Sequence, residues 1–323
     1  MGKIVAKPAL LLNKAERPNS DESTPFMLAV SLPALILTLF CAVGFAASDY
    51  FRKAAADHVP PVVLLTVFIA GQVPILGAWV WLTDGFTLTG GYWPYGLVTA
   101  ITGLLANFLF LMALRISSLS LTIPVLGLVP VITTVFAAIA LDEVPTTQQG
   151  AGIVLSVLGL MSLYVPEDNP NPIIVIKRFV TDKGARYMLA VAVLWSATAP
   201  LDKASMALSS PETHGFIQVC VMTVVMVTYL FLAQQQRTLS IARNALRPAV
   251  LASASAGLAY GCQLFAYQMT LIGAVESLKR VIGLLSALLL GRIFLGEPLS
   301  TPKLTGIALM VIGVPLIILP PLI

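Results

Sequence analysis

Three charged residues inside a long apolar stretch have the types and spacing best suited to binding chemistry. Glu276, Lys279 and Arg280 stand at positions i, i+3 and i+4 of the stretch 274–295, so a helix would place them on one face. Each charge would cost about 2.5–3.5 kcal/mol at the centre of a bilayer, so we expect all three to face the protein interior or a water-filled cavity. An arginine binds a carboxylate or phosphate through two parallel hydrogen bonds. The triad therefore predicts an anion site.

A structural role is the alternative for the same triad. Glu276 would then neutralise one cation, and the other would extend along apolar surface toward the lipid headgroups. The residue types alone leave both interpretations open.

Polar and aromatic residues also occur at depth in other apolar stretches. Tyr260, Gln263 and Tyr267 share one face of a predicted helix. Such side chains either bridge neighbouring helices or line a cavity, where tyrosines supply stacking and hydrogen bonds. The predicted substrate-binding residues are the charged triad together with Tyr260, Gln263, Tyr267, Asn107 and Trp195.

The elements that must position these residues are predicted to be membrane helices. Charged residues make up 11% of the 323 residues and hydrophobic residues 58%, whereas soluble domains carry about 25% charge. So few charges could not cover the surface of a soluble protein, which excludes a soluble enzyme, a disordered protein and a disulfide scaffold. A bilayer core of about 30 Å requires roughly 20 helical residues. Ten apolar stretches approach that length: 28–48, 60–82, 93–114, 119–141, 148–165, 185–206, 214–233, 248–269, 274–295 and 302–322.

The two halves of the chain repeat each other. Residues 141–163 and 295–317 share eight identities at an offset of 154, including Glu143 with Glu297. Each glutamate would begin the last helix of its half, where a carboxylate complements the helix dipole. Because each half has five stretches, the halves enter the membrane with opposite orientations, as in many secondary transporters. We therefore predict an all-α integral membrane protein with ten transmembrane helices in two inverted five-helix repeats.

This organisation has predicted boundaries and a predicted packing device. The segments are a polar N-terminal tail 1–27, a first repeat 28–165, a connector 166–184 and a second repeat 185–323. In the last helix of each repeat, two glycines stand seven residues apart and so share one face: Gly152 with Gly159, and Gly306 with Gly313. Small residues on one face let membrane helices approach closely.

Two motifs, LDEVPTTQQGAGI and LGEPLSTPKLTGI, together with the stretches 113–131 and 274–294, resemble a known family. They are similar to those of the drug/metabolite transporter superfamily, specifically of the EamA-type permeases with ten helices. The resemblance covers about residues 28–323 and implies alternating access around a cavity between the repeats. The short multidrug members keep an essential glutamate in their first helix. This chain has no acid between Phe26 and Ala47, so we do not expect cation exchange by that mechanism.

Charged residues also gather at the ends of the first and sixth stretches. From their types alone, Asp49, Arg52, Lys53, Asp202 and Lys203 are interfacial anchors. The family resemblance implies that these helix ends border the cavity. Asp49, Lys53, Asp202 and Lys203 are therefore predicted to gate the cavity or to couple transport to an ion.

The sequence predicts no enzyme, cofactor or metal site. The three cysteines lack CxxC spacing and nearby histidines, and without a nucleotide-binding loop ATP is not the expected energy source. His58 and His214 lie beside polar connectors and are expected to be solvated. The net charge of +4 comes mostly from Lys and Arg that flank apolar stretches, which indicates topology signals rather than nucleic-acid binding.

The expected partners are a small-molecule substrate, the lipid bilayer and a coupling proton, in the inner membrane of a bacterial cell. The orientation stays open. The odd-numbered connectors carry twelve Lys and Arg against five on the other side, which would place both termini outside, whereas the family usually keeps its termini cytoplasmic. Import and export are therefore both open.

The predicted function is secondary active transport of a small polar metabolite. Lys279 and Arg280 are similar to the adjacent Lys-Arg of the sugar-phosphate and nucleotide-sugar branch of the superfamily, where the pair contacts the anionic part of the substrate. We therefore favour an organic anion or a phosphorylated compound. An exporter of amino acids or drug-like amphiphiles, with Glu276 or Asp49 as the amine or proton site, is the first alternative. A non-transporting protein that binds anionic lipid at the Lys-Arg pair is the second.

Overall fold

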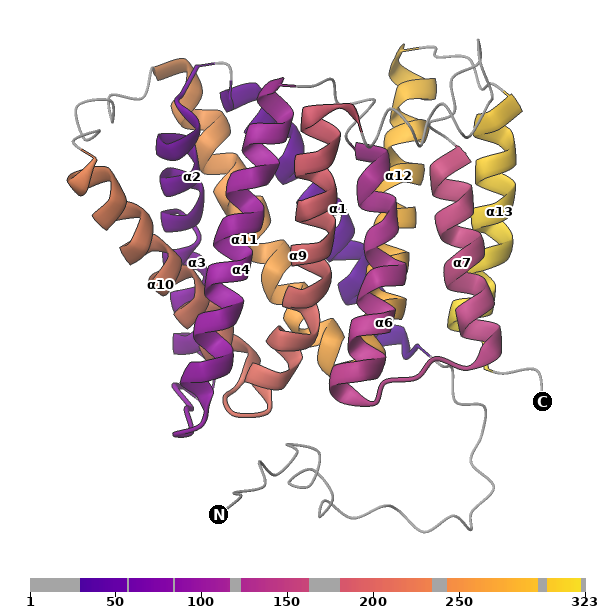
Figure 1. Ribbon diagram of the computed structural model, residues 1–323, viewed down its shortest axis with the longest axis horizontal. Helices are drawn as coiled ribbons and strands as arrows, with labels where there is room; N and C mark the ends of the chain where they lie inside the picture. The colour runs from indigo at the N-terminus through magenta and orange to yellow at the C-terminus, as the bar shows by residue number, and fades with distance from the viewer. Residues whose placement is uncertain are drawn as a thin grey trace.

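The structure is a computed structural model that describes residues 30–56, 58–83, 85–116, 123–162, 181–233, 243–295 and 301–320. Regular structure within these ranges is helical, apart from an isolated antiparallel bridge between Leu88 and Ser209. The predicted tail and most of the predicted connector lie outside the described residues. The elements are α1 (Leu32–Ala56), α2 (Pro61–Ala70), α3 (Val73–Leu82), α4 (Tyr92–Ile116), η2 (Ile123–Leu128), α6 (Val129–Leu141), α7 (Thr147–Ser162), α9 (Lys183–Met206), α10 (Pro211–Leu232), α11 (Arg243–Met269), α12 (Ile272–Leu295) and α13 (Thr301–Ile318) (Figure 1).

The helices stand side by side, as expected for a membrane bundle (Figure 1). Five spans in the described part of the chain are long and apolar enough to cross a bilayer: Leu32–Ala56, Pro61–Leu82, Tyr92–Ala113, Pro211–Leu232 and Ala245–Met269. Two shorter apolar helices cover Val125–Leu141 and Leu304–Ile318. The prediction of an all-helical membrane protein is confirmed, and the count of ten crossings stays a prediction.

The second apolar stretch is a broken span, α2 followed by α3. Pro74 lies in the first turn of α3, and its nitrogen cannot donate the hydrogen bond that would continue the helix from α2. The side-chain amide of Gln72, in the break, donates to the carbonyl oxygen of Phe68 at 3.0 Å. This bond satisfies an acceptor at the end of α2. The break places a polar residue, Gln72, among apolar helices.

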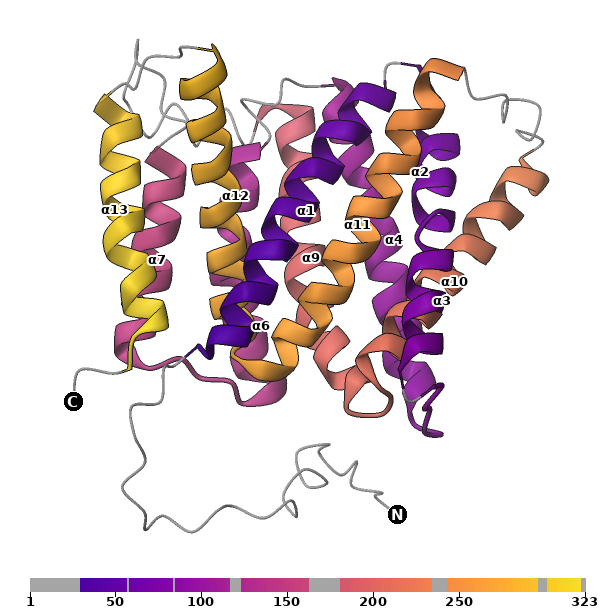
Figure 2. The ribbon, with the colours of Figure 1, turned by 180° about the vertical axis from the view of Figure 1, so that it is seen from behind.

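The contacts between helices follow the symmetry of the two halves of the chain. α1 packs against α11 and α4 packs against α9, while α7 packs against α13. In chain order α9 is the counterpart of α1, α11 of α4 and α13 of α7. The α1–α11 and α4–α9 contacts are therefore equivalent to each other. The α7–α13 contact joins two helices that are each other's counterparts. Figures 1 and 2 show that α1 and α9 run in opposite directions. This packing agrees with an inverted repeat.

Glycines allow α7 and α13 to touch along their backbones. A Cβ added to Gly152 would lie 2.7 Å from the carbonyl oxygen of Gly313, and one added to Gly159 would lie 2.7 Å from the carbonyl oxygen of Gly306. Real Cβ atoms are almost never so close to a carbonyl oxygen. The four predicted packing glycines thus meet across the contact between the two halves.

Gly152→Ala is expected to destabilise the protein, because its methyl group must separate α7 from α13. Overpacking of this kind costs about 1–3 kcal/mol. Gly150→Ala is the matched control in the same helix, since nothing lies within 4 Å of its added Cβ and alanine favours a helix by about 1 kcal/mol over glycine. Thermal unfolding in detergent should show a lower Tm for the first variant and an unchanged or higher Tm for the second. Equal Tm values would contradict the close α7–α13 contact.

A carboxylate joins the two halves at one end of the bundle. Glu143, in the loop between α6 and α7, pairs with Lys203 of α9 at 2.5 Å, and its other oxygen accepts the backbone N–H of Ile272 at 3.0 Å. Lys203 also donates to the carbonyl oxygen of Thr270 at 3.3 Å. We call the contacts of Glu143 with Lys203 and Ile272 the clasp.

The clasp corrects one prediction. Glu143 was expected to complement the dipole of α7, but it lies at the N-terminus of α12 and complements that helix instead. α7 has its own capping box, in which the Thr146 hydroxyl accepts the N–H of Gln149 and the Gln149 side chain accepts the N–H of Thr146. The equivalent Glu297 lies outside the described residues.

Glu143→Gln is expected to lower the Tm, because it removes the charge that pairs with Lys203 and weakens the bond to α12. Hydrogen bonds to a charged group contribute about 1.5–3 kcal/mol. The matched control is Asp142→Asn, since Asp142 is exposed and has a left-handed φ of 56° that asparagine tolerates well. A Tm drop of the same size in both variants would show that the clasp does not contribute.

Candidate functional site

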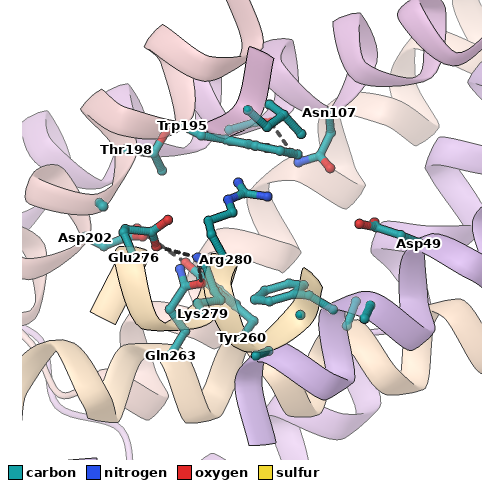
Figure 3. A pocket seen from close by; sticks show the side chains of 18 of the residues that line it. Asp49, Asn107, Trp195, Thr198, Asp202, Tyr260, Gln263, Glu276, Lys279 and Arg280 are labelled. Carbon is teal, nitrogen blue, oxygen red and sulfur yellow. Dashed lines mark hydrogen bonds and ion pairs between the residues drawn. The ribbon is translucent and has the colours of Figure 1, made fainter. Parts of the chain in front are cut away.

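A cavity of about 380 Å³ lies between the two halves of the bundle. Its walls come from α1, α2, α4, η2 and α7 of the first half and from α9, α10, α11 and α12 of the second half (Figure 3). Ten of the twelve predicted site residues line it: Asp49, Asn107, Trp195, Asp202, Tyr260, Gln263, Tyr267, Glu276, Lys279 and Arg280. Lys203 belongs to the clasp, and the side chain of Lys53 lies outside the described residues.

A buried network surrounds Glu276. Tyr267 donates to Glu276 Oε1 at 2.6 Å, and Lys279 forms an ion pair with the same oxygen. Lys279 Nζ also donates to Gln263 Oε1 at 2.7 Å. Glu276 and Tyr267 are buried. Lys279 is therefore neutralised by its neighbour one turn away, in agreement with half of the structural interpretation of the triad.

Arg280 does not behave as that interpretation requires. Its guanidinium carbon lies 5.8 Å from the centroid of the Trp195 ring, and its side chain projects into the cavity rather than toward lipid headgroups (Figure 3). None of the carboxylates in the described ranges lies within ion-pair distance of Arg280. Its Nε is buried without a hydrogen-bond partner. The cavity wall thus carries a cation that lacks a counter-ion among the described residues.

Arg52 is a second cation on the wall, and it is not the interfacial anchor that its position in the sequence suggested. It is only 4% exposed, and its guanidinium carbon lies between the rings of Phe68 and Phe110 at 4.7 and 4.6 Å. It pairs with Asp49 and donates to Asn107 Oδ1 at 3.4 Å. The spacing of Asp49 and Arg52 at i and i+3 on a helix was the available signal for this pair.

A polar chain of four residues connects two residues of the cavity wall, Asp202 and Gln218. His214 Nε2 lies 2.9 Å from Asp202 Oδ1, and His214 Nδ1 lies 2.9 Å from the hydroxyl of Tyr92. Gln218 donates to that hydroxyl at 3.2 Å. The prediction that His214 is solvated was wrong, because its side chain is fully buried, whereas His58 is exposed as expected.

Metal binding is another chemistry that such side chains could support. Among the described residues, no three His, Cys, Asp or Glu side chains are grouped so that they could hold a metal ion. The arrangement is instead that of a binding cavity, with charged and aromatic groups that converge on one enclosed space.

Comparison with solved structures supports the fold. A crystal structure of a protein superposes with a TM-score of 0.69 over 88% of this chain and 95% of that chain, at 16% sequence identity. Among curated proteins, the uncharacterized protein MJ1333.1 of Methanocaldococcus jannaschii is 27% identical over 137 residues, which cover 41% of this chain and 96% of that protein. The aligned length of that relative is close to that of one predicted repeat.

The family comparison covers both halves of the chain. The model of the EamA-like transporter family matches residues 32–165 and again residues 182–319. The two matches agree with the repeat found in the sequence and with the paired helix contacts. The chain therefore belongs to the EamA-like transporter family, a family of membrane transporters of small molecules rather than of enzymes.

Proposed function

We propose that this protein is a secondary transporter of a small organic anion, whose carboxylate or phosphate group binds Arg280. The observation that carries the proposal is the state of the three cavity cations. Arg52 pairs with Asp49 and Lys279 pairs with Glu276, whereas Arg280 has no carboxylate partner among the described residues. A cation in this position is expected to take its counter-ion from the substrate.

The surroundings of Arg280 suit an anion that arrives from water. The Trp195 ring beneath the guanidinium restricts its orientation, which leaves its hydrogen-bond donors to form parallel bonds with a carboxylate or phosphate. Asn107 and Thr198 line the same cavity and can bind further polar groups of the substrate. The cavity volume of about 380 Å³ falls in the range of about 300–1,000 Å³ typical of small-molecule sites.

Alternating access requires contacts between the halves that can open. The clasp is such a contact, because Glu143 belongs to the first half and Lys203 and Ile272 belong to the second. We infer that the clasp closes the cavity on one side and separates when that side opens. This retains the gating role predicted for Lys203, while Asp49 acts at the cavity wall as the partner of Arg52.

An amino acid is the second candidate substrate, and one observation favours it. The Asp49 side chain is 49% exposed although it pairs with Arg52, and Figure 3 shows it at the edge of the same open space into which Arg280 projects. A zwitterion would place its carboxylate on Arg280 and its ammonium group near Asp49. The two candidates therefore share Arg280 and differ in their need for Asp49.

Arg280→Gln is expected to abolish the thermal stabilisation that anions give to the purified protein. A ligand that binds only the folded state raises the Tm by mass action. Loss of a hydrogen-bonded charge of about 1.5–3 kcal/mol weakens binding by roughly 10- to 150-fold. The panel would contain phosphoenolpyruvate, glucose 6-phosphate, malate, glutamate, lysine and tetraphenylphosphonium, with Tm measured in detergent and uptake measured in proteoliposomes.

Arg115→Gln is the matched control, because it removes the same charge from an exposed position at the end of α4. Stabilisation by malate or a phosphorylated compound that persists in Arg115→Gln and disappears in Arg280→Gln would support the anion. Stabilisation by glutamate that also requires Asp49 would favour the zwitterion. Stabilisation by tetraphenylphosphonium in all variants alike would contradict both.

A further inference from the structure

We propose that Asp202 and His214 form a proton-binding site whose occupancy is linked to that of the cavity. The proposal deepens the proposed function, since it assigns the coupling ion to two residues. It rests on the proposed anion transport only for the direction of coupling. The two side chains are almost fully buried, with exposures of 1% for Asp202 and 0% for His214. Asp202 is also part of the cavity wall, so the pair lies between the substrate space and the packed interior.

The hydrogen bonds assign one tautomer to the neutral imidazole. A carboxylate only accepts hydrogen bonds, so His214 Nε2 carries the hydrogen that points to Asp202 Oδ1 at 2.9 Å. Nδ1 is then an acceptor, and the Tyr92 hydroxyl donates to it at 2.9 Å. Gln218 donates to the Tyr92 oxygen, which leaves the hydroxyl hydrogen free to point at Nδ1. The hydrogen bonds of His214 with Asp202 and Tyr92 are both satisfied with an ionised Asp202 and a neutral His214.

The same contacts accommodate one more proton. If the proton binds Nδ1, the Tyr92 oxygen can turn from donor to acceptor, and an imidazolium then faces a carboxylate. The pair then changes from a net charge of −1 to zero, while Asp202, His214 and Tyr92 keep their contacts.

Other charged groups around the pair set the field in which the proton binds. α4 contributes Tyr92, α11 contributes Tyr260 and α12 contributes the Lys279–Glu276 ion pair. On the helices of the pair itself, Lys203 is held in the clasp and Glu212 is buried at the start of α10. α2 and α3, which also pack against α10, carry no titratable side chain. Arg280 is therefore the cavity charge that a bound anion would change.

The direction of the linkage follows from charge. A bound anion neutralises Arg280, which makes the cavity more negative and favours a proton on the pair. The proton in turn favours the anion by the same free energy. The expected mode is therefore symport of one proton with the anion, whereas a cationic substrate would compete with the proton and give exchange.

Nitrogen NMR of the imidazole tests the proposal without a substrate. The chain has two histidines, so a His58→Gln protein labelled with ¹⁵N-histidine reports His214 alone. Between pH 5 and 9 we expect the Nε2–H tautomer at high pH and the imidazolium at low pH. At a pH where half of His214 is protonated, Arg280→Gln should raise the ratio of imidazolium to neutral imidazole by about twofold or more, because it removes a cavity cation as a bound anion would.

Two controls make the result decisive. Arg115→Gln removes an exposed charge and should leave the ratio unchanged, and Asp202→Asn should lower it because the imidazolium loses its counter-ion. A His214 signal that stays in one protonation state over the whole range would overturn the proposal, as would equal ratios in Arg280→Gln and Arg115→Gln. The His58→Gln protein alone shows whether His214 changes its protonation state, so this outcome does not require Asp202→Asn to fold. Failure of anions to stabilise the protein would instead reject the anion substrate and leave a titrating His214 in place.

Discussion

Charge pairing inside an apolar bundle is the constraint on which the arrangement of the cavity depends. A charged side chain in a membrane interior needs a partner or access to water. The cavity side chains meet this need locally: Asp49 with Arg52, Glu276 with Lys279 and Asp202 with His214. Once these pairs are formed, Arg280 is the one cation of the wall that has no acidic partner among the described residues.

The fold is symmetric and its chemistry is not. The pairs α1–α11 and α4–α9 are equivalent contacts, and α7–α13 repeats its own glycine contact. The positions of the first half that correspond to Lys279 and Arg280 are Val125 and Leu126, which are buried among apolar side chains. The Lys-Arg pair of α12 therefore has no charged counterpart in the equivalent segment of the first half. In the first half, the charged cavity residues Asp49 and Arg52 pair with each other, and Asn107 faces the cavity with no formal charge.

Much of this could be predicted from the sequence, and the limits have physical causes. The apolar stretches located the helices, and the spacing of Glu276, Lys279 and Arg280 placed them on one face, because both follow from local geometry. The failures concern partners from other elements. His214 stands next to a polar connector in the sequence, yet Asp202 and Tyr92 surround it in the fold. Glu143 begins one helix in the sequence but binds the first residue of another. No periodicity within one segment reports which distant segment will supply a hydrogen bond.

The attachment of the clasp to α12 has a mechanical consequence. Glu143 holds Ile272, the first residue of α12, and Arg280 follows eight residues later, about 12 Å along a continuous helix. If the clasp is the proposed gate, α12 would move as one rigid helix, with the clasp at its first residue and Arg280 further along. Any tilt of α12 when the clasp releases must carry Arg280 with it. A single tilt of α12 would then change both the opening of the clasp and the position of Arg280. No relay of intermediate side chains would be needed between the two.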